Sequence, residues 1–152
     1  MFRGDHPLTL DAKGRIAIPA RHRERISELC AGALIITVSL TDKCLSMYPF
    51  PEWKRIEDDI QKLPTFDVQA QAIRHLLIGR ATEMDMDSHG RILVPPALRE
   101  WAELDKRVRL VGQGRKFEVW DEPRWLERIE ALHGRDGTAL SQPSEALSTL
   151  VL

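Results

Sequence analysis

The chain has 152 residues, of which 43% are hydrophobic and 30% are charged, and its formal net charge at pH 7 is −1. This composition predicts a soluble, folded protein with its own core. Residues 29–41 are free of charge but fall short of the ~20 apolar residues that a membrane-spanning helix needs. Residues 1–6 carry no apolar signal segment, so we expect a cytoplasmic protein without membrane association.

The two cysteines, Cys30 and Cys44, form no CxxC pair and are not flanked by clustered histidines. This pattern argues against a disulfide framework and against a structural zinc site. Reduced, packed thiols are the simpler interpretation. We therefore expect no metal and no cofactor.

The distribution of charge is uneven along the chain. Residues 1–27 hold six basic and three acidic residues, a local excess of three positive charges, so the remainder is acidic. This asymmetry indicates one basic surface, although a solvated helix with alternating charges gives similar counts.

Alternating apolar residues predict two half-buried strands, at 8–10 and 16–18, on either side of a turn at 12–14. Together they predict a β-hairpin. Gly14 can take the positive φ that such a turn demands, and Asp11 can accept hydrogen bonds from the turn's own amides. Pro19 then stands where a helix can begin.

Further elements follow in the same half of the chain. Strands are expected at 33–39 and 44–48, and Pro51 opens a helix. The expected apolar residues of that helix are Trp53, Ile56, Ile60 and Leu63. Residues 67–79 are expected to form a connecting helix, whose apolar face consists of Val68, Ala72, Ile73, Leu76 and Leu77.

In the second half, Pro95 stands where a helix can begin, and Leu98, Trp101 and Leu104 form one buried stripe. Strands are expected at 107–112 and 116–120, joined through residues 113–115. Asp121 is expected to cap a last helix, with Trp125, Ile129 and Leu132 on one face. The apolar end of the tail, at 147–152, either docks on a neighbour or frays.

An internal repeat relates the two halves. Residues 11–19 (DAKGRIAIP) match residues 87–95 (DSHGRILVP), with Asp, Gly, Arg, Ile and Pro all displaced by 76 positions. A second match, displaced by 72, relates Leu45, Met47, Tyr48 and Trp53 to Phe117, Val119, Trp120 and Trp125. We ascribe the difference to one shortened loop. The predicted organisation is a first repeat at 1–63, a connecting helix at 64–80, a second repeat at 81–133 and a tail at 134–152.

The two DxxGRIxxP motifs, their tandem arrangement and residues 48–53 (YPFPEW) together resemble the MraZ family over about the whole chain. The resemblance implies an α+β fold, a tandem-repeat AbrB-like swapped-hairpin β-barrel with peripheral helices and pseudo-two-fold symmetry. It implies a nucleoid-associated, sequence-specific DNA-binding transcriptional regulator. Its target would be the cell-division and cell-wall gene cluster, including its own promoter, which it would repress. It would bind short direct repeats as a ring-shaped homo-oligomer.

The DNA-binding candidates lie in and around the two repeated turns. An arginine beside a glycine turn can present a planar fork of donors to guanine or to phosphate, which suits Arg15 and Arg91. Lys13 is a flexible point charge that suits phosphate better than base readout. The candidates for further phosphate contacts are Arg3, Arg21, Arg23 and His89. Because His89 replaces Lys13 in the second repeat and is largely neutral near pH 7, we expect the first turn to contact phosphate more strongly.

The same residues also have a purely structural interpretation. Asp11 with Arg15, and Asp87 with Arg91, can pair across each turn and fix its conformation around Gly14 or Gly90. The sequence does not separate pairing from DNA contact, and the two can coexist. In a ring, identical basic turns would add avidity without new chemistry, and direct repeats ~10 base pairs apart would meet adjacent subunits.

Two other classes of protein compete with this interpretation. Residues 85–89 (DMDSH) offer two carboxylates and an imidazole for an enzyme, but they belong to the repeated turn, and no catalytic motif or small-molecule site accompanies them. We therefore expect no catalytic residues. An antitoxin-like protein-interaction module is the alternative, although such proteins usually carry one motif rather than two. Its partner surface would use the tryptophans, which at periodic positions are more often core. These are Trp53, Trp101, Trp120 and Trp125.

Overall fold

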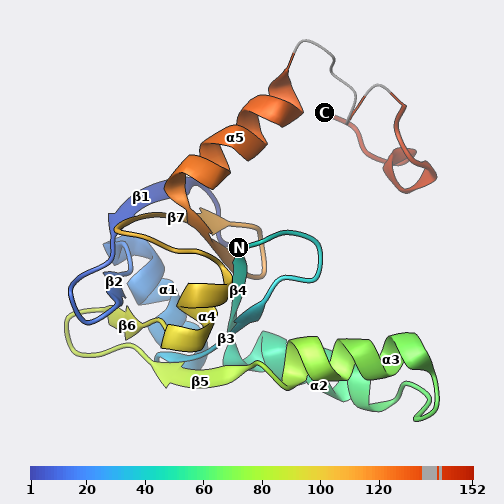
Figure 1. Ribbon diagram of the computed structural model, residues 1–152, viewed down its shortest axis with the longest axis horizontal. Helices are drawn as coiled ribbons and strands as arrows, with labels where there is room; N and C mark the ends of the chain where they lie inside the picture. The colour runs from blue at the N-terminus through green and yellow to red at the C-terminus, as the bar shows by residue number, and fades with distance from the viewer. Residues whose placement is uncertain (135–139, 141) are drawn as a thin grey trace. The chain divides into compact units, whose positions relative to one another are not determined.

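The strands of the computed structural model form two antiparallel sheets, and the model describes residues 1–134, 140 and 142–152 (Figure 1). The larger sheet has, in spatial order, β1 (Asp5–Thr9), β7 (Arg107–Gly112), β8 (Phe117–Asp121), β4 (Leu45–Pro49), β3 (Ala33–Val38) and β5 (Thr82–Asp85). A two-stranded ribbon pairs β2 (Arg15–Ala17) with β6 (Arg91–Leu93). Both sheets therefore combine strands from the two repeats.

The first strand of each repeat pairs with the third strand of the other repeat. In β1 and β7, Leu8 lies opposite Val108, and in β5 and β3, Met84 lies opposite Leu34. The predicted β-hairpin of residues 8–10 with 16–18 is therefore wrong, because β1 and β2 lie in different sheets. A periodic pattern identifies a strand but does not identify its partner, and here the other repeat supplies that partner.

Two of the four ladders between the repeats are centred on equivalent residues. In the ribbon, Ile16 faces Ile92, its counterpart at a displacement of 76. Between β4 and β8, Ser46 faces Glu118, its counterpart at a displacement of 72. Equivalent strands thus meet each other antiparallel, so all eight strands belong to one compact unit, Met1–Glu122.

The repeats differ in length at two places rather than in one loop. Leu34 and Val108 are equivalent, because they lie opposite Met84 and Leu8, which are themselves equivalent residues of the two repeats. They are displaced by 74 positions, a value between the displacements of 76 and 72 in the two sequence matches. The first shortening falls around the helix after the second strand, which is α1 (Ala20–Cys30) in one repeat and α4 (Pro96–Trp101) in the other. The second falls in the loop between the third and fourth strands.

The main core lies between the ribbon and the large sheet. Ile16, Ile18, Ile92 and Val94 enter it from the ribbon strands and the residues that follow them, and each is at most 1% exposed. The sheet contributes a matching set of fully buried side chains, Ile36, Leu45, Met47, Leu110 and Phe117. Ile26 of α1 and Leu98 of α4 join the same cluster. Both repeats thus fill one shared core, which fixes the ribbon on the sheet.

A second, smaller cluster joins the connecting segment to the sheet. Its buried members are Ile35, Tyr48, Trp53, Ile60 and Leu77, drawn from β3, β4, α2 (Phe50–Gln61) and the connecting segment. That segment is α3 (Val68–Ile73), continued by the π-helical turn η1 (Arg74–Ile78), with the Asp67 side chain accepting from the Ala70 amide. Thr37 donates to the Leu77 carbonyl at 2.7 Å and ties this segment to β3.

Several side chains predicted on buried helical faces are exposed instead. Val68 is 79% exposed, Leu76 46% and Leu63 36%. The buried residues of α3 and η1 are Ala70 and Leu77, and Leu63 lies beyond the end of α2 at Gln61. Leu104 lies beyond α4, which ends at Trp101, although it still packs against the main core. These segments therefore carry more apolar side chains than they bury.

The second compact unit, Pro123–Leu152, begins in α5 (Glu122–His133). It includes a short 3-10 turn, Glu145–Leu147, and the end of the chain is exposed at Leu150, Val151 and Leu152. Part of the predicted tail at 134–152, residues 135–139 and 141, lies outside the described residues. Within the described ranges, no helix is long and apolar enough to cross a membrane.

Candidate nucleic-acid interface

The first repeated turn is organised by the carboxylate of Asp11. Its Oδ1 accepts hydrogen bonds from the backbone amides of Lys13 at 2.9 Å and Arg15 at 2.8 Å. Its Oδ2 accepts from Nε of Arg15 at 2.8 Å. The Gly14 amide donates to the Asp11 carbonyl, and Gly14 has φ +82°, which favours glycine. One carboxylate thus fixes both the turn and the arginine beside it.

The second turn repeats this arrangement atom for atom. Asp87 Oδ1 accepts from the amides of His89 at 2.8 Å and Arg91 at 2.9 Å, and Oδ2 accepts from Nε of Arg91 at 2.8 Å. Gly90 has φ +74°. The pairing of Asp with Arg across each turn is therefore present in both repeats. Each pair uses Nε, so the terminal nitrogens Nη1 and Nη2 stand outside it and can still serve a ligand.

These hydrogen bonds make both turn carboxylates stronger acids. The backbone amide of Arg91, followed by its side chain and the His89 amide, lowers the pKa of Asp87 from 3.8 to about 2. The equivalent amide of Arg15 lowers the pKa of Asp11. Hydrogen bonds to the charged form favour ionisation, so both carboxylates are ionised at neutral pH.

Ionised Asp87 should stabilise its turn fully above about pH 4 and lose that effect as the pH falls through about 2. In an NMR titration, the amide shifts of His89 and Arg91 should change together with a midpoint near pH 2. Asp87→Asn keeps an acceptor oxygen but cannot titrate, so it should abolish this step. A midpoint at the ordinary 3.8 would contradict the hydrogen bonding described here.

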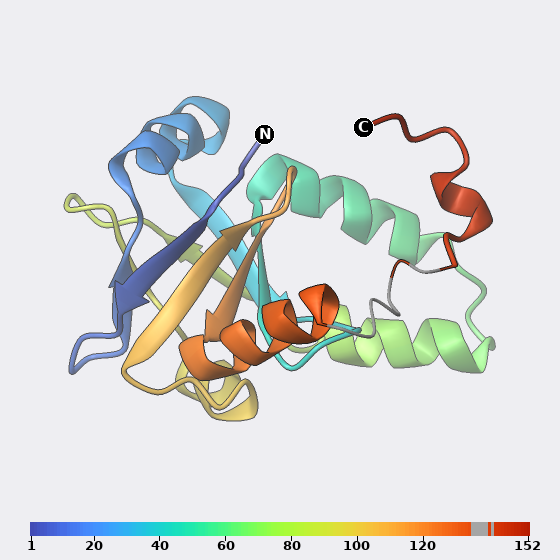
Figure 2. The same ribbon diagram turned by 90° about the horizontal axis from the view of Figure 1, so that it is seen from above.

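The outer face of the ribbon joins the two turns. Ile16 and Ile92 point into the core, so their neighbours Arg15, Ala17, Arg91 and Leu93 lie on the opposite face. Arg15 faces Leu93 and Ala17 faces Arg91, which places the two arginines diagonally across the pair. The turns that precede β2 and β6 both lie at the left edge in Figures 1 and 2. The ribbon and both turns thus present one continuous surface.

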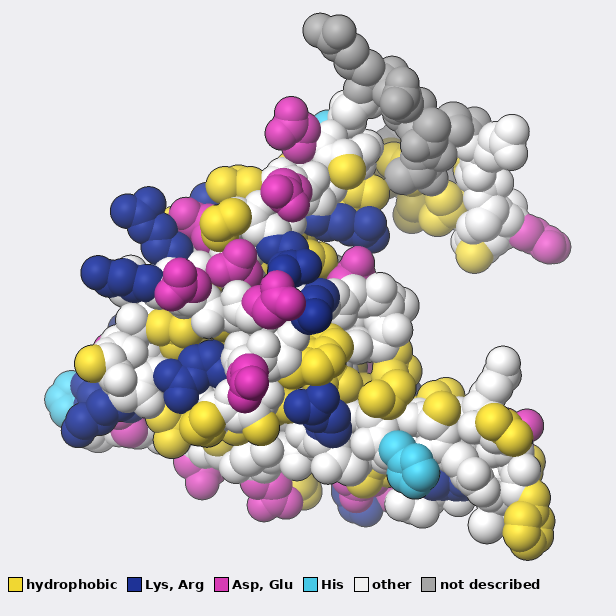
Figure 3. All heavy atoms as spheres, viewed as in Figure 1, with side chains coloured by type: hydrophobic (Ala, Val, Ile, Leu, Met, Phe, Trp, Pro, Cys, Tyr) yellow, Lys and Arg dark blue, Asp and Glu magenta, His cyan; other side chains and the backbone are white. Residues whose placement is uncertain are grey.

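The remaining candidates are spread around this surface. Lys13, Arg3 and His89 are exposed. The space-filling view shows Lys and Arg side chains and one histidine at the end that carries the turns, with a few acidic side chains between them (Figure 3). Arg21 lies in the first turn of α1, where its Nη2 donates to the Arg3 carbonyl at 3.5 Å.

Arg23 is placed differently from the other candidates. It is half-buried on α1, and its Nη1 donates to the His89 carbonyl in the turn of the other repeat at 3.0 Å. Arg99, which was not among the predicted site residues, holds the equivalent place on α4 and packs on the first turn at Gly14. The displacement of 76 that relates Gly14 to Gly90 also relates Arg23 to Arg99, and this signal could have identified it.

The residues proposed for other functions have structural roles. Asp87, from the candidate enzyme cluster, uses both carboxylate oxygens inside its turn. Within the described ranges, no three His, Cys, Asp or Glu side chains are placed to hold a metal ion. Trp53 and Trp120 are each 3% exposed, whereas Trp101 and Trp125 are half-buried. The spacing predicted core positions for all four tryptophans, and this is confirmed for Trp53 and Trp120.

Comparisons with known proteins are consistent over the length of the chain. A family model described as "MraZ protein, putative antitoxin-like" matches residues 1–76 and again residues 77–141. A protein of Thioalkalivibrio sulfidiphilus named "Transcriptional regulator MraZ" is 52% identical over 153 residues, covering 100% of both chains. Proteins of the same name are 47% identical in Pseudomonas aeruginosa, covering 94% of this chain and 92% of the relative, and 44% identical in Saccharophagus degradans, covering 97% and 99%.

Proposed function

Because the chain belongs to the MraZ family, we propose that it is a transcriptional regulator that binds DNA through the β2–β6 ribbon and the two repeated turns. The observation that carries this proposal is the diagonal placement of Arg15 and Arg91 on the exposed face of that ribbon. The major groove of B-DNA admits a two-stranded β-ribbon, and arginine forks are its commonest specific contacts.

The ribbon suits base readout because its arginines are already oriented. Asp11 and Asp87 each hold the Nε of their arginine, so each guanidinium is fixed before DNA arrives. A side chain that is ordered in the free protein loses less conformational entropy on binding. The terminal nitrogens, which the pairs with Asp11 and Asp87 leave unused, can then contact O6 and N7 of guanine. Exposed Ala17 and Leu93 supply the apolar surface that a thymine methyl group fits.

The turns suit phosphate contacts that set the register on the duplex. Lys13 brings a positive charge to the first turn, and His89 brings a largely neutral imidazole to the second. The two turns therefore contribute unequally near neutral pH. Arg3 and Arg21 extend the basic surface beside the first turn.

The symmetry of the strand registers supports the architecture that the resemblance implies. The exchange of β1 and β5 between repeats, and the ladders centred on Ile16–Ile92 and Ser46–Glu118, fit a swapped-hairpin barrel with pseudo-two-fold symmetry. Copies of this unit in a ring would present their ribbons in sequence, which matches direct repeats rather than palindromes. The expected target is the chain's own promoter at the head of a cell-division and cell-wall gene cluster, where binding represses transcription.

Binding to a promoter fragment with tandem direct repeats, measured against a scrambled fragment of equal length, tests this function. We expect preference for the repeats and a linear fall of log affinity with log salt, at ~0.9 per phosphate neutralised. Lengthening the spacer between the repeats by half a helical turn should abolish the gain in affinity from the second repeat. The two repeats would then lie on opposite faces of the duplex, where adjacent subunits cannot bind both. Equal affinity for both fragments at every salt concentration would contradict sequence-specific binding.

A further inference from the structure

We propose that Arg23 and Arg99 are positioning residues that hold the DNA-binding turns across the repeats, so that the helix of each repeat sets the turn of the other. Arg23 belongs to α1 of the first repeat but lies on the turn at Gly90. Arg99 belongs to α4 of the second repeat but lies on the turn at Gly14. The inference deepens the proposed function and rests on it.

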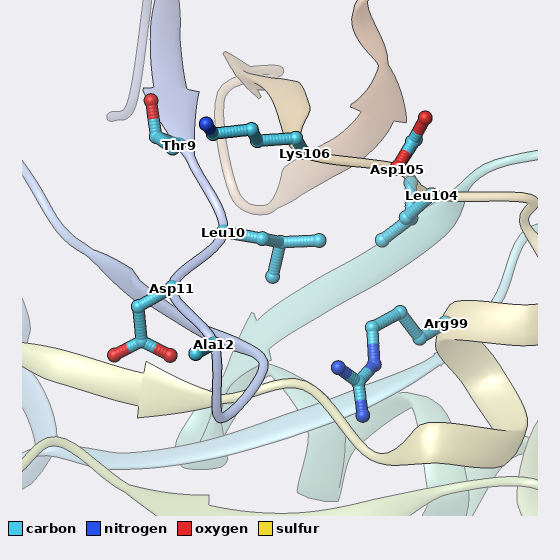
Figure 4. Close-up of a pocket in the computed structure, with 8 residues that line it drawn as sticks. All are labelled: Thr9, Leu10, Asp11, Ala12, Arg99, Leu104, Asp105 and Lys106. Carbon is cyan, nitrogen blue, oxygen red and sulfur yellow. The ribbon is translucent and has the colours of Figure 1, made fainter.

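The contact is close enough to explain why both turns use glycine. A β-carbon at Gly14 would lie 2.5 Å from Cζ of Arg99, and one at Gly90 would lie 2.6 Å from Nε of Arg23. Side chains at these positions would displace the arginines, even apart from the positive φ. Figure 4 shows Arg99 extending from α4 toward the turn that carries Asp11 and Ala12. Each guanidinium thus covers the glycine of a turn from the other half of the chain.

Arg23 also makes a directed contact. Its Nη1 donates to the His89 carbonyl at 3.0 Å, whereas its Nε is buried without a hydrogen-bond partner among the described residues. A buried donor without a partner is costly, so a surface arginine would be expected to keep its Nε in water. The cost is tolerated where the side chain is held against Gly90. The hydrogen bond to the His89 carbonyl and the buried Nε both indicate that the Arg23 side chain lies over the turn and does not extend into solvent.

The backbone carbonyls of the two glycines connect each turn to the β2–β6 ribbon. The Gly90 carbonyl accepts from the Ile18 amide, and the Gly14 carbonyl accepts from the Val94 amide, both at 2.9 Å. Each turn is therefore hydrogen-bonded to the residue that directly follows the ribbon strand of the other repeat, and that strand begins with the DNA-reading arginine. If the turn at Gly90 loses Arg23, the adjacent Arg91 should be held less firmly. Loss of Arg99 from the turn at Gly14 should affect Arg15 in the same way.

Hydrogen exchange measured by mass spectrometry on the full chain without DNA tests the contact directly. In Arg23→Met, amide exchange in residues 87–91 should accelerate by at least about threefold while residues 11–15 remain unchanged. In Arg99→Met, amide exchange should accelerate in residues 11–15 and remain unchanged in residues 87–91. Arg23→Lys should behave like Arg23→Met, because the lysine ammonium ends near the position of the arginine Cζ, one bond short of the Nη1 that donates to the His89 carbonyl. Arg25→Met, on the same helix and exposed, should leave both turns unchanged.

Double-mutant cycles on DNA binding then test the positioning role. Arg23→Met should couple to Arg91→Ala by at least about threefold in affinity and should be additive with Arg15→Ala, while Arg99→Met should show the opposite pattern. Additive behaviour in all four cycles, with Arg23→Lys binding like the wild type, would instead make Arg23 a direct phosphate contact and overturn the inference. Unchanged exchange in both turns would also overturn it. If the exchange pattern holds but the wild type binds no DNA, the cross-repeat contact stands and the proposed function fails.

Discussion

Replacing Arg15 by alanine should weaken binding to tandem-repeat DNA by about 5- to 150-fold, the loss of one bidentate base contact of about 1–3 kcal/mol. The turn itself should survive, because the Asp11 carboxylate still accepts from the amides of Lys13 and residue 15. The effect would therefore come from the missing guanidinium rather than from unfolding. In an oligomer every subunit loses the same contact, so the loss grows with the number of subunits engaged.

The Arg15→Ala effect is best measured by titration at several salt concentrations, with circular dichroism to confirm folding. Arg55→Ala is a matched control, because Arg55 is an exposed arginine on α2, paired with Glu52 on its own helix. It should bind like the wild type. A folded Arg15→Ala protein with wild-type affinity would leave the Asp11–Arg15 pair as a structural feature only.

Replacing Phe117 by alanine should destabilise the fold by about 3–5 kcal/mol, the usual range for a fully buried phenylalanine. Phe117 is fully buried, lies opposite Met47 between β8 and β4, and packs on Phe2 with ring centroids 4.2 Å apart. Its neighbours therefore include first-repeat residues. Both repeats should lose stability together, in a single transition of Met1–Glu122.

Chemical denaturation followed by tryptophan fluorescence and by far-ultraviolet circular dichroism measures this effect. Phe66→Ala removes the same atoms from a site that is 93% exposed, and it should change stability by no more than about 0.5 kcal/mol. If Phe117→Ala unfolded the second repeat while the first remained folded, the two halves would be separate domains and the shared core would be disproved.

The elements of this fold were largely predictable from local patterns, and their pairing was not. The strands predicted at 33–39 and 107–112 correspond to β3 and β7, and Pro19 and Pro95 marked where α1 and α4 begin. Nothing in residues 5–17, taken alone, indicates that β1 joins β7 while β2 joins β6. Pairing partners depend on which long-range contacts bury the most apolar surface, and a local pattern does not contain that information.

The candidate site was predicted with similar limits. Asp11 and Asp87 hold their arginines as the repeated spacing suggested, because an aspartate can bond the amides two and four residues later. The placement of Arg23 against the turn of the other repeat was not predictable, since it depends on the exchange of strands. The clue lay in comparing the repeats, where Arg23 and Arg99 share the displacement of the two glycines.

The most direct test of the central claim is to map which residues DNA protects. Hydrogen exchange of the full chain, with and without a tandem-repeat fragment at low salt, should show the largest slowing at residues 12–17 and 88–93, with smaller effects around Arg3 and Arg21. Protection concentrated elsewhere, for example on α2 and α3, with residues 12–17 and 88–93 unchanged, would show that DNA is bound by another surface and would contradict the ribbon as the reader.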